Sequence, residues 1–248
     1  AVGSNLNFAP VLDVDTNPDN PVIGNRAFGQ SPLLVAEHGL AMMSGLQDNK
    51  IIACGKHFPG HGDTHLDSHK TLPKVTHSIA RLNDIELKPF IHLAQNRLAS
   101  IMTAHVVYKA LDPKRPATLS KKIVTGLLRE AIGFTGVIIS DDLEMKGITD
   151  NGTVAESAVL AIAAGCDLLL VCHAYDQQIA ALEALIHAVE KGDIPEERID
   201  QSVHRILALK ERFHLGGRKT NLNEVKKVVG SDQHLALVEG IERRAENI

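Results

Sequence analysis

Apolar and polar residues follow two different patterns along the chain. Continuous apolar runs of strand length recur, and the segments between them carry apolar residues at helical spacing. The apolar runs cover residues 5–12, 51–55, 100–107, 136–140 and 167–172. The helical segments cover residues 33–46, 85–98, 121–132, 154–164, 177–191 and 196–215. This order predicts a parallel sheet covered by helices on both faces, either a doubly wound sheet or a (β/α)8 barrel.

Polar residues at the ends of the apolar runs favour the barrel. Titratable side chains follow the predicted strands directly, namely Asp13, Lys56 with His57, His105, Asp141 with Asp142, and His173. In a (β/α)8 TIM-type barrel the carboxyl ends of different strands converge on one face, where the active site is built. A dinucleotide-binding sheet would instead carry a glycine-rich turn after the first strand, and none follows Leu12.

The predicted strands are fewer than those of a complete barrel. We therefore expect about five C-terminal βα units of the barrel plus C-terminal helices, with the N-terminal part absent from this chain. Residues 1–215 are expected to form this partial catalytic barrel, and residues 216–248 a helical tail or linker. An incomplete sheet should have an exposed edge strand or be completed by another chain.

Composition describes an ordinary globular chain and argues against two classes of partner. The 248 residues are 44% hydrophobic and 23% charged, and a net charge of -4 gives no basic footprint for nucleic acid or an anionic membrane. No stretch approaches the roughly 18 consecutive apolar residues of a membrane span. The three cysteines lie in apolar runs, which favours buried reduced thiols. We expect a cytoplasmic protein, although a chain that does not begin with Met leaves a secreted form open.

The densest chemistry lies in residues 56–69, just after the second apolar run. This segment packs four histidines and two aspartates into fourteen positions, beside the helix breakers Pro59, Gly60 and Gly62. Folding alone does not require so many titratable side chains in one place. The segment is therefore interpreted as a functional loop at the end of a strand.

Five motifs along the first 145 residues resemble successive motifs of family 3 glycoside hydrolases. They are Asn-Phe-Ala-Pro-Val-Leu-Asp-Val at 7–14, Gly-Asn-Arg-Ala-Phe-Gly at 24–29, Gly-Lys-His-Phe-Pro-Gly-His-Gly-Asp at 55–63, Asp-Ser-His at 67–69, and Ser-Asp-Asp-Leu-Glu-Met at 140–145. The chain is most similar to the β-N-acetylhexosaminidase branch (NagZ), because the Asp-Ser-His triplet marks that branch. The resemblance implies removal of terminal N-acetylglucosamine from peptidoglycan-derived muropeptides or related β-glycosides.

The residues themselves and the resemblance point to the same catalytic groups. A retaining glycosidase needs a carboxylate nucleophile and a group that protonates the leaving oxygen. Asp141 suits the nucleophile because it directly follows an apolar strand, whereas Asp142 suits a cap of the next turn. The resemblance assigns the acid/base role to His69 with Asp67 as its partner, and an imidazole titrates in the useful range.

The same comparison assigns the sugar-binding residues. Arg26, Lys56 and His57 match positions that hold the hydroxyls of the terminal sugar, a task for which charged donors are suited. Asp13 and His105 also follow predicted strands and are candidates for supporting the floor of the pocket. We expect no cofactor and no metal, and the sequence makes no prediction of oligomeric state.

Three alternatives remain at this point. The histidines recur every fourth residue, as metal ligands on one face of a helix would, so a barrel metallohydrolase using loop histidines is one of them. A glycoside phosphorylase of the same family is the second, because a histidine acid/base does not repel an incoming phosphate as a glutamate would. A sugar-binding remnant without catalysis is the third.

Overall fold

The computed structural model describes residues 2–68, 70–216 and 221–245. The strands are β1 (Leu6–Asn7), β2 (Ile52–Phe58), β3 (Lys74–Val75), β4 (Ser100–Thr103), β5 (Val107–Tyr108), β6 (Val137–Asp142) and β7 (Leu168–Leu170). The α-helices are α1 (Pro32–Asp48), α2 (Ile79–Asp84), α3 (Lys88–Gln95), α4 (Lys146–Thr149), α5 (Val154–Ala164), α6 (Tyr175–Glu190), α7 (Glu196–Arg212), α8 (Leu222–Val228) and α9 (Asp232–Ala245). Three further helical segments are η1 (Gly24–Arg26), η2 (Ala117–Leu119) and η3 (Lys122–Ala131), the last with π-type hydrogen bonding.

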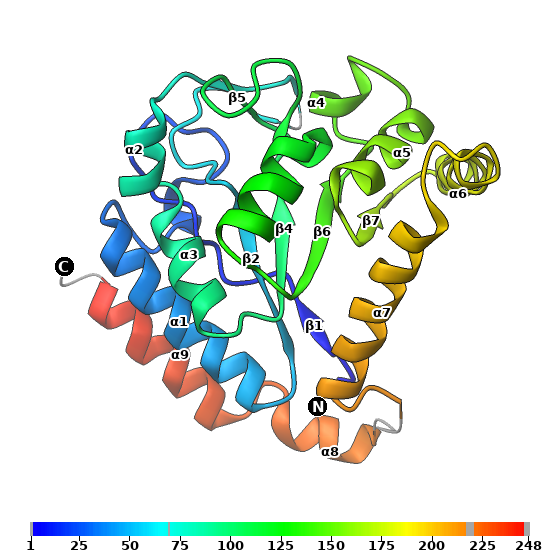
Figure 1. Cartoon of the computed structure of the whole chain (residues 1–248). Coiled ribbons are helices and arrows are strands. Elements are labelled where there is room, and N and C mark those ends of the chain that lie inside the picture. Colours follow the sequence, from blue (N-terminus) through cyan, green and yellow to red (C-terminus); the bar gives the residue numbers. More distant parts are fainter. Residues whose placement is uncertain (1, 69, 217–220, 246–248) are drawn as a thin grey trace.

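A curled parallel sheet lies at the centre of the chain (Figure 1). Its strand order is β1-β2-β4-β6-β7, and each neighbouring pair is parallel. Strands that are neighbours in space therefore follow one another along the chain, as in a TIM-type barrel. The prediction of a partial (β/α) barrel is confirmed. The sheet is open among the described residues, because β1 and β7 form its two edges.

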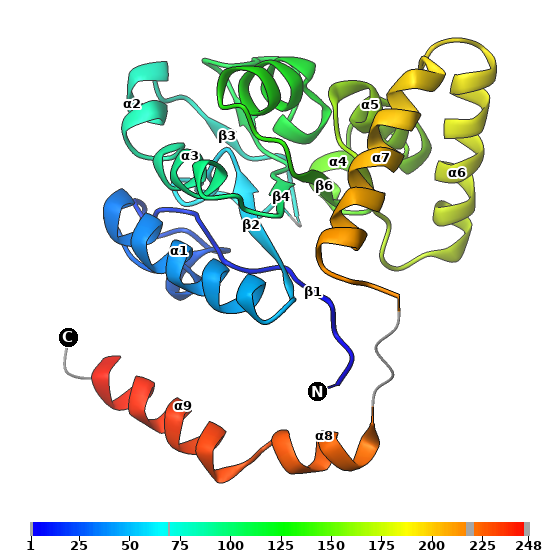
Figure 2. The ribbon, with the colours of Figure 1, turned by 60° about the horizontal axis from the view of Figure 1, so that its bottom comes forward.

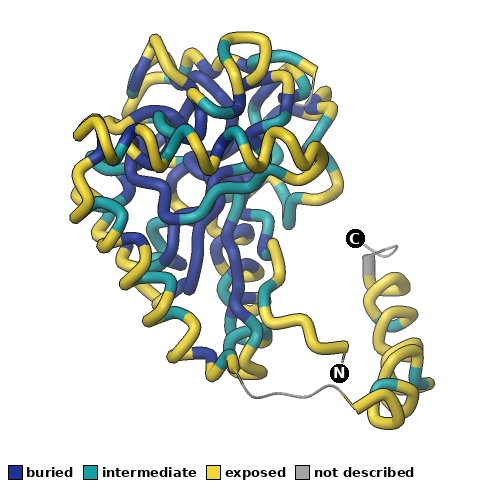
Figure 3. The backbone as a smooth tube through the Cα atoms, turned by 90° about the vertical axis from the view of Figure 1, so that its right-hand side faces the viewer, coloured by how far each residue is buried: buried dark blue, intermediate teal, exposed yellow. Residues whose placement is uncertain are grey.

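Burial of continuous apolar strands holds the sheet between the helices. The central strands β2, β4 and β6 are buried over most of their length, so both faces are covered, as a parallel sheet requires. Figure 3 shows the buried backbone running through the middle of the molecule. The main cluster joins Leu12, Phe58, Phe90, Ile101 and Ile138, and these contacts fix the strand ends that carry the polar residues.

Local signals explain where the helices begin and end. Thr153 caps α5 through the Glu156 N–H at 3.1 Å, the Glu156 carboxylate accepts from the Thr153 N–H at 2.9 Å, and Gly165 ends the helix at φ 124°. The predicted helix 154–164 is therefore confirmed at both ends. The predicted helix 85–98 is wrong at its start, because α3 begins at Lys88 with Pro89 in its first turn, where a missing N–H does no harm.

Three predicted strands are also shorter than expected, and of these the run 167–172 is a regular strand only over β7. The run 100–107 is divided, because β4 ends at Thr103 and Val107 joins Lys74 in a separate two-stranded sheet. The run 5–12 forms a regular strand only at β1, although Leu12 donates to the Lys56 carbonyl at 2.6 Å and so continues beside β2. The chain between β4 and β5 carries His105, whose Nδ1 lies 2.8 Å from Thr118 Oγ1.

The helices α8 and α9 follow the barrel segment and lie below it in Figure 2. Most of their residues are exposed (Figure 3). The division into residues 1–215 and 216–248 stays a prediction. Among the described residues, no helix combines the length and the apolar character needed to cross a membrane.

Candidate active site

The carboxyl ends of β2, β4 and β6 lie on the side of the sheet where α2, β5 and α4 are seen at the top of Figure 1. The segment after β1 reaches the same place, because Val11 bridges Lys56 in parallel register. Asp13, Lys56, His57, His105 and Asp141 therefore come from neighbouring strands of one sheet. This is the arrangement from which barrel enzymes build their sites.

Asp13 fixes the backbone and the ring of His57. Its carboxylate accepts from the His57 N–H at 3.1 Å, from His57 Nδ1 at 2.7 Å and from the His61 N–H at 2.6 Å. Burial raises the pKa of Asp13, but the charges and hydrogen bonds of His57 and His61 outweigh burial and lower the pKa overall. Because the ionised carboxylate can only accept, His57 Nδ1 carries a proton, and Nε2 is left for other contacts.

Lys56 brings a cation to this strand end without neutralising a carboxylate. Its side chain is half-buried and makes no hydrogen bond or ion pair with any described residue. Burial lowers the pKa of Lys56, as does Arg26, while Asp141 and Asp13 act in the opposite direction. Arg26 is exposed and donates to the Val22 carbonyl at 3.1 Å. The two cations are thus near each other, and their donors remain available to an oxygen-rich ligand.

Asp141 is the last residue but one of β6 and has a half-buried carboxylate. Its Oδ1 accepts from the Asp142 N–H at 2.9 Å. Burial raises the pKa of Asp141. His105, His57, this hydrogen bond and Lys56 together lower the pKa by more than burial raises it, so it falls below its ordinary value. The group is therefore ionised at neutral pH while keeping accessible surface, as a nucleophilic carboxylate must.

The neighbouring Asp142 has a different environment. Its Oδ1 accepts from the N–H groups of Glu144 at 3.2 Å and Cys172 at 3.3 Å, and Oδ2 lies 3.4 Å from His173 Nε2. The carboxylate therefore caps the turn after β6, as its position in the sequence indicated.

His105 contacts the backbone of the same turn. It is fully buried, and its Nε2 lies 2.9 Å from the Asp142 carbonyl and its Nδ1 2.8 Å from Thr118 Oγ1. A carbonyl only accepts, so Nε2 carries the proton. Burial lowers the pKa of His105, which favours the neutral ring, although Asp141 and Asp142 act in the opposite direction. His105 thus contacts the backbone that carries Asp141, a supporting position.

The loop after β2 is non-helical between Pro59 and Ser68. His57, His61 and His65 therefore do not stack on one face of a helix, as Pro59, Gly60 and Gly62 in the sequence indicated. Among the described residues, no group of three or more His, Cys, Asp or Glu side chains comes together in a metal-binding arrangement. His69 lies outside the described residues.

Close packing holds this loop against the segment after β1. A Cβ at Gly62 would lie 1.8 Å from the Val14 carbonyl oxygen, so only glycine fits there. Asn20 Nδ2 donates to the carbonyls of His61 at 2.9 Å and Gly62 at 3.0 Å. The loop carrying Arg26 and the loop carrying Asp67 are therefore fastened to each other.

Of the proposed acid/base pair, Asp67 lies within the described residues. Asp67 is half-buried, and its backbone carbonyl accepts from the N–H groups of Lys70 and Thr71 at 3.0 Å each. The roles assigned to Asp67, His69, Asp141, Arg26, Lys56 and His57 stay predictions.

Sequence reasoning missed the importance of His61 and Ser68. Both side chains are 2% exposed, and their hydrogen bond measures 3.0 Å. The only available signal was that His61 stands between two glycines, which indicates close packing around it. A cavity of about 630 Å³ lies elsewhere, between α5 and α6, and is lined mainly by apolar residues.

Comparisons with known proteins agree with the motifs. A β-hexosaminidase A from Pseudoalteromonas piscicida is 37% identical over 234 residues, which cover 86% of this chain and 39% of the relative. The solved structure of a glycoside hydrolase family 3 β-N-acetylglucosaminidase from Paenibacillus sp. str. FPU-7 superposes with a TM-score of 0.89 at 48% identity, over 96% of this chain and 45% of that one. A β-glucoside phosphorylase, BglX, superposes with a TM-score of 0.87 at 26% identity, over 94% and 43%.

The chain thus spans less than half the length of these relatives. The family profile described as the glycosyl hydrolase family 3 N-terminal domain matches residues 1–209. The order of the motifs, the curled parallel sheet and this match agree, and the chain belongs to glycosyl hydrolase family 3.

Proposed function

We propose that this chain is the catalytic portion of a retaining β-N-acetylglucosaminidase that acts on peptidoglycan-derived muropeptides or related β-glycosides. The observation that carries the proposal is the environment of Asp141. Its carboxylate is ionised and accessible at the carboxyl end of β6, where the neighbouring His105, His57 and Lys56 lower its pKa. The relatives named β-hexosaminidase and β-N-acetylglucosaminidase support the substrate class.

In the proposed first step, Asp141 attacks the anomeric carbon of the terminal sugar. The glycosidic C–O bond breaks, and the leaving oxygen takes a proton from His69, whose imidazolium is stabilised by Asp67. In the second step, His69 takes a proton from water, and the resulting nucleophile displaces Asp141 from the sugar. The two displacements restore the enzyme and retain the anomeric configuration.

The cationic and imidazole groups of the strand ends have a separate task. Lys56, His57 and Arg26 would donate to the hydroxyls of the same sugar and so place its anomeric carbon over Asp141. Asp13 would keep the His57 ring in the orientation that leaves Nε2 facing the sugar, since Nδ1 is already engaged at 2.7 Å. Hydrogen bonds that strengthen as positive charge develops on the ring lower the barrier further.

Phosphorolysis is the second candidate, and one observation favours it. The structure of a β-glucoside phosphorylase resembles this chain with a TM-score of 0.87. Phosphate in place of water would attack the glycosyl-enzyme and yield a sugar 1-phosphate. A neutral imidazole at position 69 would not repel that dianion, whereas a carboxylate would.

The experiment compares nitrophenyl β-N-acetylglucosaminide with nitrophenyl β-glucoside, with and without inorganic phosphate. We expect release of nitrophenol from the N-acetylglucosaminide at a rate independent of phosphate, with free N-acetylglucosamine as the product. Sugar 1-phosphate as the main product would replace hydrolysis with phosphorolysis. Turnover of neither substrate by a folded chain would leave the sugar-binding remnant as the better reading.

A further inference from the structure

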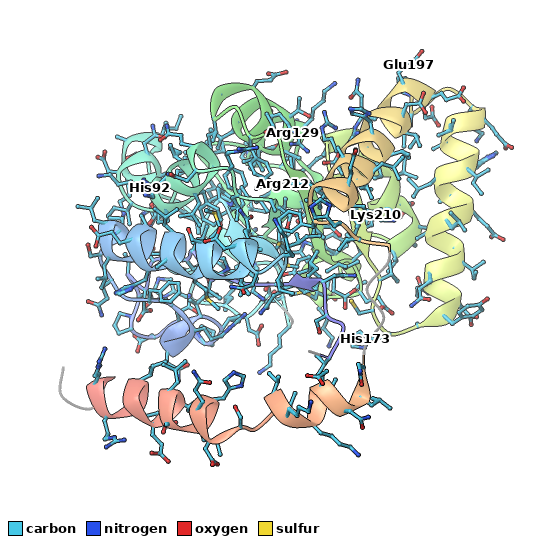
Figure 4. The ribbon with its side chains drawn as sticks, turned by 90° about the horizontal axis from the view of Figure 1, so that it is seen from below. His92, Arg129, His173, Glu197, Lys210 and Arg212 are labelled. Atoms are coloured by element: carbon cyan, nitrogen blue, oxygen red, sulfur yellow. The ribbon has the colours of Figure 1, made fainter. Side chains whose placement is uncertain are left out.

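A cavity of about 340 Å³ lies at the amino end of the sheet, away from the candidate active site. It is lined by the residues that lead into β4 and β6, by the end of α3 and by the second half of α7. Figure 4 views this end of the molecule and labels Arg212 and Lys210 of α7. A cavity of this size is large enough for a small ligand.

The charged side chains that line this cavity are all basic. They are Arg97, Arg205 and Arg212, together with His204, and no Asp or Glu is among the lining residues. The chain as a whole carries a net charge of -4, so basic residues do not collect here because of composition. A concave surface lined by one sign of charge concentrates ions of the opposite sign. The lining therefore favours an anion.

Arg212 is held at the cavity without a carboxylate partner. Its Nη2 donates to the Arg97 carbonyl at 3.0 Å, and its guanidinium carbon lies 5.1 Å from the centre of the Phe213 ring. Neither Arg97 nor Arg212 forms an ion pair with any described residue. Burial lowers the pKa of Arg212, and the charge of Arg97 acts in the same direction, so the two cations repel each other. A bound anion would remove this repulsion.

Arg205 adds a third guanidinium that is only partly engaged. Its Nη1 donates to Asp167 Oδ1 at 3.0 Å and to the Gln201 carbonyl at 3.4 Å. Its Nε and Nη2 make no hydrogen bond with any described residue. Arg205 and Arg212 are seven residues apart on α7, which places them on the same face of the helix, two turns apart. One helix face thus presents two guanidinium groups to one cavity.

We propose that this cavity binds a phosphoryl group, either as free inorganic phosphate or as the phosphate of a phosphorylated sugar. The planar guanidinium group donates two parallel hydrogen bonds to phosphate oxygens. A phosphate monoester carries about 1.5 to 2 negative charges at pH 7, so it compensates several arginines better than a single carboxylate would. The site lies at the other end of the sheet from Asp141, and the proposal does not depend on the proposed function.

A basic residue at the end of a helix also has a simpler role, and the chain offers a control for it. Arg97 follows the end of α3 at φ 63°, and Lys50 follows the end of α1 at φ 62°. A cation at either position compensates the partial negative charge of a helix C-terminus. Lys50 does not line the cavity. Comparison of the two positions therefore separates anion binding from compensation of the helix dipole.

The test is isothermal titration calorimetry of the whole chain at low ionic strength, first with inorganic phosphate and then with glucose 6-phosphate. We expect saturable binding to one site in the millimolar range or tighter. Arg97→Asn and Arg212→Gln should each weaken binding about tenfold or more, because each removes a charged donor. Asparagine tolerates the positive φ of position 97. Tighter binding of glucose 6-phosphate than of phosphate would identify a phosphorylated sugar as the ligand, and the reverse order free phosphate.

The matched controls are Lys50→Asn and Lys210→Gln, which remove exposed cations that do not line the cavity. Each should change the affinity for phosphate less than about twofold. Equal weakening by Lys50→Asn and Arg97→Asn would reduce the effect to general charge and overturn the site. If Arg212→Gln fails to fold, Arg97→Asn carries the test, because the Arg97 side chain makes no hydrogen bond with a described residue. Absence of saturable binding by the wild-type chain also overturns the proposal.

A second measurement locates the bound phosphate, because Arg26 and Lys56 could also attract it at the carboxyl end. Phenylglyoxal modifies accessible arginines, and mass spectrometry of peptides shows which of them phosphate protects. We expect protection of Arg97 and Arg212, and phosphate binding by Asp141→Asn that equals the wild type. Protection of Arg26 alone, or binding that is lost in Arg26→Gln and unchanged in Arg97→Asn, would place the phosphate at the candidate active site and overturn the proposal.

Discussion

The two ends of the parallel sheet each hold a carboxylate, and the surroundings of these two carboxylates differ. At the amino end of β7, Asp167 forms ion pairs with Arg129, Arg198 and Arg205 and accepts from Ser202 Oγ at 2.9 Å and the Ile138 N–H at 3.0 Å. Figure 4 views this end from below and labels Arg129 beside α7. At the carboxyl end of β6, Asp141 accepts one backbone hydrogen bond and lies near cations that make no ion pair with it.

This difference separates a structural carboxylate, Asp167, from the carboxylate proposed as the nucleophile, Asp141. Around Asp167 every direction of approach is filled, and the arginines are fixed in turn by backbone carbonyls, as Arg198 is by Ile162 and Cys166. Burial lowers the pKa of Arg129 to about 10, which still leaves it charged at neutral pH. A charge that is fully paired stabilises the fold, whereas a charge that is held in place without a full set of partners is free to react.

The largest effect should come from removing the reactive charge. Asp141→Asn keeps the size of the side chain but removes the nucleophile, so kcat should fall on the order of 10³-fold or more with the free energy of unfolding nearly unchanged. The measurements are steady-state kinetics with the nitrophenyl N-acetylglucosaminide and a denaturant titration. Asp142→Asn is the matched control and should retain most of its activity. An inactive Asp142→Asn variant beside an active Asp141→Asn variant would show that Asp142, and not Asp141, is the nucleophile.

Removing the paired charge should have the opposite profile. Asp167→Asn leaves three guanidinium groups without their shared carboxylate, so the free energy of unfolding should fall by about 3–5 kcal/mol. The protein that remains folded should keep its KM. Asp193→Asn, at an exposed carboxylate near the same arginines, should change the free energy by less than about 0.5 kcal/mol. An Asp167→Asn variant as stable as the wild type would show that burial at this end does not depend on the ion pairs.

The third prediction concerns the pH dependence of stability and involves two buried histidines at the carboxyl end of the sheet. His61 titrates at about 4 in the folded chain against an ordinary pKa of 6.5, so the unfolded chain takes up a proton first as the pH falls. The contribution of His61 to the free energy of unfolding is complete above pH 6.5. It falls by roughly 3 kcal/mol between pH 6.5 and pH 4. Denaturant titrations at pH 7 and pH 5 should therefore differ less in His61→Phe than in the wild type. His105 shifts in the same direction and supplies the slope that remains.

The general arrangement of the fold could be predicted from local signals in the sequence. Continuous apolar runs predicted the strands, and the apolar spacing of residues 154–164 predicted α5 with its bounds. Regular hydrogen bonding within an element leaves a period that can be read without the tertiary structure. Errors arose where tertiary contacts interrupt the period, as at His105, where the chain leaves β4 to reach Thr118.

The candidate site could be predicted only in part, for a related reason. Asp141 and Lys56 can be recognised in the sequence, because each is a charged residue that follows an apolar run. Ser68 and His61 do not, since a serine or histidine in a loop reads the same whether it is exposed or buried. Their partners lie on separate turns and on α4. The ion pairs of Asp167 with its arginines could not be predicted from the sequence either, because the arginines come from η3 and α7.

The contact between Gly62 and Val14 sets limits for engineering the specificity of this loop. Because the Val14 carbonyl occupies the space of a Cβ at position 62, a combinatorial library that randomises this codon would consist mostly of misassembled clones. Positions 65 and 66 are different, since His65 and Leu66 are exposed and lie between fixed points of the same loop. Diversity placed there would alter an exposed part of the loop, while Gly62 and the backbone packed on it stay in place.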